Sequence, residues 1–104
     1  MSNPENYTVI AEAGYVCGVG LLHQSGEIRL MYVSPQTQRR GVGRALLDGL
    51  EVHAQRLGLT RLYLSSTASA RSFYEAAGYR DCNESETWRG IVCYKYDKAI
   101  VPIA

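Results

Sequence analysis

Residues 27–50, EIRLMYVSPQTQRRGVGRALLDGL, contain three kinds of segment in direct succession. An apolar run typical of a strand ends at Ser34-Pro35, a turn rich in arginine and glycine follows, and an amphipathic run typical of a helix begins at Gly43. A helix that starts at a glycine-rich turn presents backbone N–H groups without intrahelical partners, and its dipole places partial positive charge there. The sequence therefore predicts a strand, an anion-binding turn and a helix, with phosphate as the ligand.

The turn between strand and helix has the residues that phosphate binding needs. Gly41 and Gly43 allow the backbone to approach a ligand closely. Arg39, Arg40 and Arg44 add fixed positive charge, and a guanidinium group can hold phosphate oxygens through two parallel hydrogen bonds. The expected ligand therefore carries a phosphate or a pyrophosphate group.

Two other phosphate-binding loops do not fit this turn. The P-loop requires Lys directly after its last glycine, whereas Arg44 follows Gly43. The dinucleotide fingerprint requires Gly or Ala at the position of Leu46, and an acidic residue near the end of the next strand, where LYLSS (62–66) has none. The turn therefore belongs to another class.

The turn instead resembles the acetyl-CoA pyrophosphate motif of the GNAT N-acetyltransferase superfamily. Residues 38–43, QRRGVG, fit its pattern Q/R-x-x-G-x-G/A. Residues 32–35, YVSP, resemble the family's pantetheine-contacting segment, and residues 70–79, ARSFYEAAGY, resemble its A-x-x-F-Y-x-x-x-G-[FY] helix. The resemblance runs from Tyr7 to about Lys98. It implies an α/β (α+β) fold with a GNAT-like mixed central sheet and flanking helices.

The resemblance also implies a cosubstrate, acetyl-CoA, and the residues that bind it. The implied pyrophosphate-binding residues are Gln38, Arg39, Arg40, Gly41, Val42, Gly43 and Arg44. The implied pantetheine contacts are the main-chain groups of Met31, Tyr32 and Val33. Thr67 stands where the family often carries an asparagine near CoA, and Phe73 belongs to the second motif and is expected at the cofactor.

N-acetylation requires a neutral amine to attack the thioester carbonyl and a proton for the departing thiolate. Tyr74 occupies the family position whose phenol donates to the CoA sulfur; the alternative is an aromatic ring packed beside Phe73. Glu27, eleven residues before Gln38, stands where the histone-acetylating branch carries its general base; the alternative is an exposed residue at a strand start. The implied reaction is direct transfer to a primary amine of a small molecule or peptide.

The chain also departs from the family pattern. Only six residues precede Tyr7, so the usual first strand and the following two helices, which wall the acceptor pocket, have no counterpart in this N-terminally truncated arrangement. A non-catalytic acyl-CoA-binding or protein-interaction module is therefore the alternative function. An uncovered sheet face would favour a homodimer.

The pattern of turns predicts the order of the elements. An antiparallel meander is expected over 7–12, 15–23 and 27–34, then a helix over 42–57 ended by Gly58, a strand over 59–66 parallel to 27–34, a helix over 69–77, and a hairpin of 79–84 and 89–96. Trp88, Val92, Tyr94 and Tyr96 are expected to share one face of the last strand, chiefly as core residues.

Composition narrows the class of protein. The 104 residues, 46% hydrophobic, suit one domain over 1–104. No segment approaches the roughly 20 apolar residues that span a bilayer, so a cytoplasmic protein without a membrane partner is expected. A net charge of +1 does not indicate nucleic-acid binding. Cys17, Cys82 and Cys93 lack the spacing of a metal site, and we expect no metal and three buried thiols.

Overall fold

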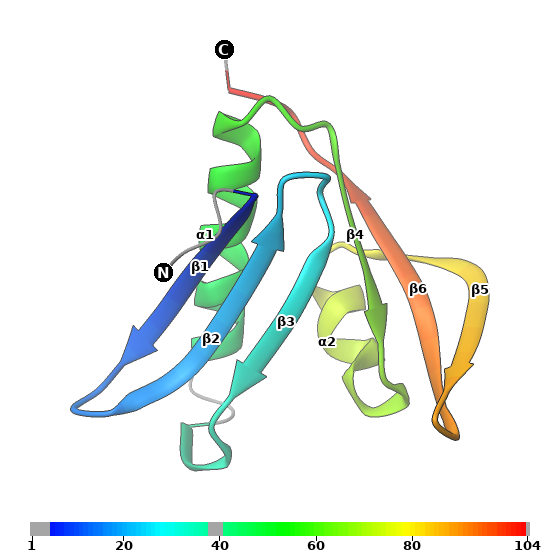
Figure 1. Cartoon of the computed structure of the whole chain (residues 1–104), viewed down its shortest axis with the longest axis horizontal. Helices are drawn as coiled ribbons and strands as arrows, with labels where there is room; N and C mark the ends of the chain where they lie inside the picture. The colour runs from blue at the N-terminus through cyan, green and yellow to red at the C-terminus, as the bar shows by residue number, and fades with distance from the viewer. Residues whose placement is uncertain (1–4, 38–40, 104) are drawn as a thin grey trace.

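The computed structural model describes residues 5–37 and 41–103 (Figure 1). Within these ranges the chain forms strands and helices in the predicted order. They are β1 (Asn6–Glu12), β2 (Val16–His23), β3 (Ile28–Val33), the 3-10 helix η1 (Pro35–Thr37), α1 (Val42–Arg56), β4 (Arg61–Ser66), the 3-10 helix η2 (Ala68–Ala70), α2 (Arg71–Ala76), β5 (Arg80–Trp88) and β6 (Ile91–Ala99). The predicted mixed architecture of helices and strands is confirmed.

The strands form two antiparallel sheets of three strands, ordered β1-β2-β3 and β4-β6-β5. A parallel bridge between Glu27 and Tyr63 joins them, and the Tyr63 N–H donates to the Gly26 carbonyl at 3.0 Å. From this bridge β3 and β4 run in the same direction and diverge toward their C-terminal ends (Figure 1). The parallel orientation expected for the strand after α1 is confirmed. The mixed central sheet is therefore divided into two halves that meet at one bridge.

Both helices contribute to one core on the same side of the sheets. The buried cluster contains Leu22, Ile28, Leu47, Leu50, Ala54, Leu62, Leu64, Tyr74, Ala77, Tyr79 and Tyr96. A glycine in β2 lets α1 pack closely against the first sheet: a Cβ built on Gly18 would lie 2.8 Å from Cδ1 of Leu46. The apolar face of α1 thus packs against a strand that has a glycine, and therefore no side chain, where Leu46 lies.

The other face of the first sheet carries exposed apolar side chains. Ile10, Leu30 and Tyr32 are 52%, 45% and 51% exposed. They lie on the face opposite to Val9 and Met31, which pack against the core. In the part of the chain that the structure describes, both helices lie on the core side, and neither is long and apolar enough to cross a membrane.

The last hairpin is longer than predicted. β5 continues to Trp88 and the turn lies at Arg89 and Gly90, with φ values of 50° and 81°. Positive φ at both central residues is typical of the type I′ turn that joins two twisted strands. The predicted gap between residues 84 and 89 is therefore wrong. Trp88 ends β5 beside the turn and is 63% exposed, and Val92 in β6 is 41% exposed, so the expected core positions of both are wrong. Tyr96 is fully buried as expected.

The three cysteines occupy different environments. Cys17 is buried in β2, as predicted. Cys82 and Cys93 lie in β5 and β6 and are partly exposed, so the prediction of buried thiols is wrong for these two. Alternation along β6 places Cys93 on the face opposite to Tyr96, which packs in the core. Among the described residues, no group of three His, Cys, Asp or Glu side chains could hold a metal ion.

Candidate active site

The main cavity of the structure lies where β3 and β4 diverge. It has a volume of about 760 Å³ and is enclosed by the end of β3, the start of α1, and the segment from η2 into α2. The residues that line it are Met31, Val33, Gly41, Gly43, Arg44, Ser69, Ala70, Ser72, Phe73 and Tyr74. Residues from both predicted motifs, far apart in the sequence, therefore line one cavity.

The first turn of α1 opens into this main cavity. Gly41 caps the helix in a left-handed conformation, with φ of 79°, and among the described residues no side chain bonds to the first N–H groups. Helix geometry leaves these donors without intrahelical partners, and the first turn contains no acidic residue that would oppose an anion. Gly43 keeps space open between the helices, because a Cβ there would lie 3.3 Å from Cε1 of Phe73. The geometry can hold an anionic group.

Among the described residues, an arginine in the helix supplies positive charge near this turn. Arg44 lines the main cavity, and its Nε donates to Asp48 Oδ1 at 3.1 Å, one turn along α1. Both side chains are about half exposed, so this pair is weak and leaves most of the guanidinium donors available. The predicted binding residues Gln38, Arg39 and Arg40 lie outside the described residues.

The end of β3 forms another wall. Met31 and Val33 line the cavity, whereas the side chain of Tyr32 lies on the outer face, as strand alternation requires. β3 is the last strand of its sheet, so beyond the Glu27 bridge its second edge faces the gap toward β4. An edge strand offers main-chain donors and acceptors to an extended ligand.

Tyr74 is the buried polar group of the cavity. Its side chain is 7% exposed and packs edge to face against Phe73 and Tyr79, with ring centroids 5.1 and 5.8 Å apart. Within the described residues its hydroxyl makes no hydrogen bond. Burial raises the pKa of Tyr74, so the phenol stays protonated at neutral pH. The packing of the Tyr74 ring beside Phe73 is therefore compatible with a role of its hydroxyl as a proton donor.

Two predicted binding residues lie beside the cavity and do not line it. Val42 packs its Cγ1 close to Gly18, 3.0 Å from where a Cβ would be. Thr67 is exposed, and its hydroxyl lies 3.3 Å from the Ser69 hydroxyl. Three lining residues, Ser69, Ala70 and Ser72, were not predicted as site residues, although Ala70 and Ser72 lie within the second motif. Small residues at the start of a helix carry no signal that marks them as lining a cavity.

Glu27 does not line the main cavity. It lies at the bridge where the sheets meet, and its Oε1 accepts a hydrogen bond from Arg29 Nε at 2.7 Å. It borders a second, outer cavity of about 230 Å³, together with Arg61, Tyr63, Leu64, Ser65, Cys82, Glu84, Lys95 and Tyr96. Arg61, Tyr63 and Ser65 alternate in β4 with the buried Leu62 and Leu64, so the outer cavity opens on the face away from the helices.

Comparison with known proteins identifies the family. Residues 1–100 match the family described as an acetyltransferase (GNAT) domain. The chain belongs to this family. It is 28% identical over 76 residues to an amino-acid acetyltransferase from Pseudomonas putida, an alignment that covers 68% of this chain and 18% of that relative. The chain thus spans less than a fifth of the length of that curated relative.

Solved structures share the fold. A GCN5-related N-acetyltransferase from Rhodopseudomonas palustris, also described as a class-II aminotransferase, is 26% identical with a TM-score of 0.84, over 91% of this chain and 62% of that one. An aminoglycoside 6'-N-acetyltransferase complexed with coenzyme A is 16% identical with a TM-score of 0.85, over 98% of this chain and 77% of that one. The predicted family and fold are confirmed.

Proposed function

We propose that this chain is an N-acetyltransferase that transfers an acetyl group directly from acetyl-CoA to a primary amine. Membership of the GNAT family supports acyl transfer, and the fold neighbour described with coenzyme A supports acyl-CoA as the donor. One observation carries the proposal: the N-terminal turn of α1 and the Tyr74 ring border the same cavity. A pyrophosphate and a thioester of one ligand can bind there together.

In this proposal the donor binds along the helix-facing side of the gap. Its pyrophosphate contacts the N–H groups at the start of α1, with contributions from Gln38, Arg39, Arg40, Gly41, Val42, Gly43 and Arg44. Its pantetheine pairs with the main chain of Met31, Tyr32 and Val33 on the free edge of β3, with Thr67 and Phe73 nearby.

The reaction needs two proton transfers. The neutral amine nitrogen attacks the thioester carbonyl carbon, forming a C–N bond, and the C–S bond breaks as the tetrahedral intermediate collapses. The leaving thiolate takes the proton of the Tyr74 hydroxyl, which then recovers a proton from solvent, as its raised pKa favours. The nitrogen loses its proton to Glu27, directly or through water. Glu27 borders the outer cavity, so the amine approaches from that side.

The outer cavity and the relatives support one class of acceptor. The outer cavity carries the carboxylates of Glu27 and Glu84 and the cations of Arg61 and Lys95, which suits a small molecule with both charges. Curated relatives named as amino-acid acetyltransferases support an α-amino acid as the first acceptor to test. Lysine-containing peptides and polyamines are the other primary amines to be tested as acceptors.

The test is turnover with defined amines. The protein is mixed with acetyl-CoA and, separately, with each standard amino acid, a polyamine and a lysine-containing peptide, and free thiol and product mass are measured. The proposal predicts thiol release that matches an N-acetyl product for at least one amine. Thiol release at the background rate with every amine would contradict the catalytic proposal.

The exposed face of the first sheet favours a second candidate function. Ile10, Leu30 and Tyr32 stay exposed in this structure, so a non-catalytic acyl-CoA-binding or protein-interaction module would use them as its contact surface. This candidate predicts acetyl-CoA binding without turnover. For the enzyme we infer a homodimer through the same face, and a cytoplasmic location without nucleic-acid or membrane partners.

A further inference from the structure

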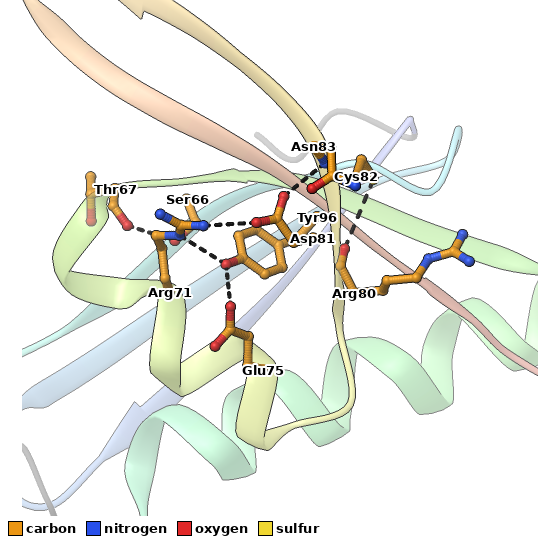
Figure 2. Close-up of polar contacts among 9 residues, drawn as sticks. All are labelled: Ser66, Thr67, Arg71, Glu75, Arg80, Asp81, Cys82, Asn83 and Tyr96. Atoms are coloured by element: carbon orange, nitrogen blue, oxygen red, sulfur yellow. Dashed lines mark hydrogen bonds and ion pairs between the residues drawn. The ribbon is translucent and has the colours of Figure 1, made fainter.

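A network of polar side chains ties α2 to the second sheet (Figure 2). Tyr96 is fully buried in β6, the middle strand of that sheet. Its hydroxyl accepts a hydrogen bond from Arg71 Nε at 3.0 Å and donates one to Glu75 Oε2 at 2.6 Å. Arg71 and Glu75 are four residues apart in α2 and share one side of the helix. One phenol therefore holds both ends of this helix.

Arg71 extends the network to β5. The Nη2 group of Arg71 donates to Asp81 Oδ2 at 2.7 Å, and its Cζ lies 4.0 Å from the centre of the Tyr94 ring. Asp81 Oδ1 in turn accepts from the Asn83 N–H at 2.8 Å, where β5 is irregular. Burial and the bond to Glu75 raise the pKa of Tyr96, so its donor proton is present at neutral pH.

The network acts on a helix that cannot hold its own position. α2 has six residues, and a helix of this length is unstable in water without tertiary contacts. The same helix and the η2 turn before it supply Ser69, Ala70, Ser72, Phe73 and Tyr74 to the main cavity. Tyr96 itself does not line that cavity. A group outside the cavity thus fixes one of its walls.

We propose that Tyr96, through Arg71 and Glu75, is a positioning residue that holds α2 in place as a wall of the acyl-CoA cavity. Removing the hydroxyl takes away both hydrogen bonds that Tyr96 in β6 makes to α2, and leaves only the bond from Arg71 to Asp81 in β5. A direct Arg71–Glu75 pair formed in its absence would lie within α2 and would not attach the helix to β6. The helix would then move, and binding would have to order it again.

The test uses the Tyr96→Phe variant with Asp97→Asn as the matched control. Asp97 is the next residue in β6, is also buried, and bonds to Arg61 and Arg80 on the outer face, away from α2. The rate of hydrogen exchange of the α2 amides, relative to those of α1, reports how firmly the helix is held. Calorimetry reports the affinity for acetyl-CoA. Glu75→Ala is the second variant, because Glu75 is exposed and its loss leaves the core intact.

For Tyr96→Phe and Glu75→Ala we expect α2 exchange to rise about tenfold relative to α1 and acetyl-CoA affinity to fall about tenfold, the scale of one or two lost hydrogen bonds. Glu75→Gln keeps an acceptor for the hydroxyl and should restore most of both. Asp97→Asn should leave the exchange ratio and the affinity within about twofold of wild type. Unchanged α2 exchange in both Tyr96→Phe and Glu75→Ala would overturn the proposal.

The affinity readout rests on the proposed function, whereas the exchange readout does not. If wild-type protein fails to bind acetyl-CoA, the proposed function fails, and selective exchange of α2 in Tyr96→Phe still supports the positioning role. If wild type binds and Tyr96→Phe binds equally well, the positioning role is wrong and the proposed function stands.

Discussion

Gly43 in the first turn of α1 faces the ring of Phe73 in α2: a Cβ on Gly43 would lie 3.3 Å from Phe73 Cε1 and 3.4 Å from Val33 Cγ2. Three walls of the main cavity, one each from β3, α1 and α2, therefore meet at a position without a side chain. The cavity depends on this space, because a side chain at position 43 would fill the point where the three walls meet.

We expect Gly43→Ala to weaken acetyl-CoA binding by about fivefold, since a methyl group here pushes on Phe73 and Val33 and overpacking costs on the order of 1 kcal/mol. Gly49→Ala is the control in the same helix: its Cβ would lie 3.7 Å from Val9, an ordinary contact. The control should bind normally. Calorimetric affinities for both variants decide this, and equal affinities would argue against the assigned donor position.

Tyr74→Phe should slow turnover by about a hundredfold, the usual scale of general acid catalysis, with acetyl-CoA affinity within about twofold of wild type. The ring keeps its packing against Phe73 and Tyr79, so only the proton donor is lost. Tyr79→Phe is the matched control, because that buried hydroxyl donates to Glu51 at 2.8 Å. It should lower stability and leave the rate per folded molecule unchanged. A Tyr74→Phe enzyme of normal rate would remove Tyr74 from the mechanism.

Packing of α1 against β2 predicts a stability effect. A Cβ on Gly18 would lie 2.8 Å from Leu46 Cδ1 and 3.1 Å from the Tyr32 carbonyl oxygen. Gly18→Ala should therefore destabilise the protein by about 1–3 kcal/mol. Urea unfolding measures this change, and an unchanged midpoint would mean that α1 packs farther from β2.

Stability should also depend on pH through His53. Its ring stacks on Tyr7 with centroids 3.6 Å apart, and burial, with the nearby Arg56, lowers its pKa from the usual 6.5. The unfolded chain binds this proton more tightly, so the free energy of unfolding falls as the pH drops below about 6.5. His53→Gln removes this contribution to the pH dependence. The difference between the wild-type and variant urea midpoints should therefore become smaller as the pH is lowered from about 7.5 to about 5.5, and a constant difference would contradict this.

The exposed sheet face predicts a homodimer. Light scattering should give twice the chain mass of 11.5 kDa at micromolar concentration. Leu30→Lys, on this face in β3, should give the monomer, and Leu57→Lys, a similarly exposed leucine at the end of α1, should not. A monomeric wild-type protein would count against a dimer through this face.

Local signals were enough to predict most of the fold. Glycines mark the ends of elements, as at Gly58 after α1, and alternating or helical apolar spacing marks what lies between them. The hairpin turn was misplaced because Arg89 adopts a positive φ that its residue type does not indicate. The split into two sheets depends on how far β3 and β4 stay in register, which no local pattern records.

The candidate site was partly predictable. The two motifs named residues that line one cavity, among them Gly43 and Tyr74. Alternation separates the side chain of Tyr32 from those of Met31 and Val33, which agrees with the prediction that Tyr32 contributes only main-chain groups. The bonds of Tyr96 to α2 join residues 25 and 21 positions apart. Contacts of that kind arise from tertiary packing and leave no trace in the spacing of the sequence.

Calorimetric titration of the wild-type protein with acetyl-CoA, dephospho-CoA and ATP tests most directly whether the main cavity binds acyl-CoA. We expect micromolar binding of acetyl-CoA, and binding of dephospho-CoA within about tenfold because it keeps pyrophosphate and pantetheine. ATP should bind at least about a hundredfold more weakly, because it lacks the segment that pairs with β3. No binding of acetyl-CoA by the folded protein, or equal binding of ATP, would show that this cavity is not an acyl-CoA site.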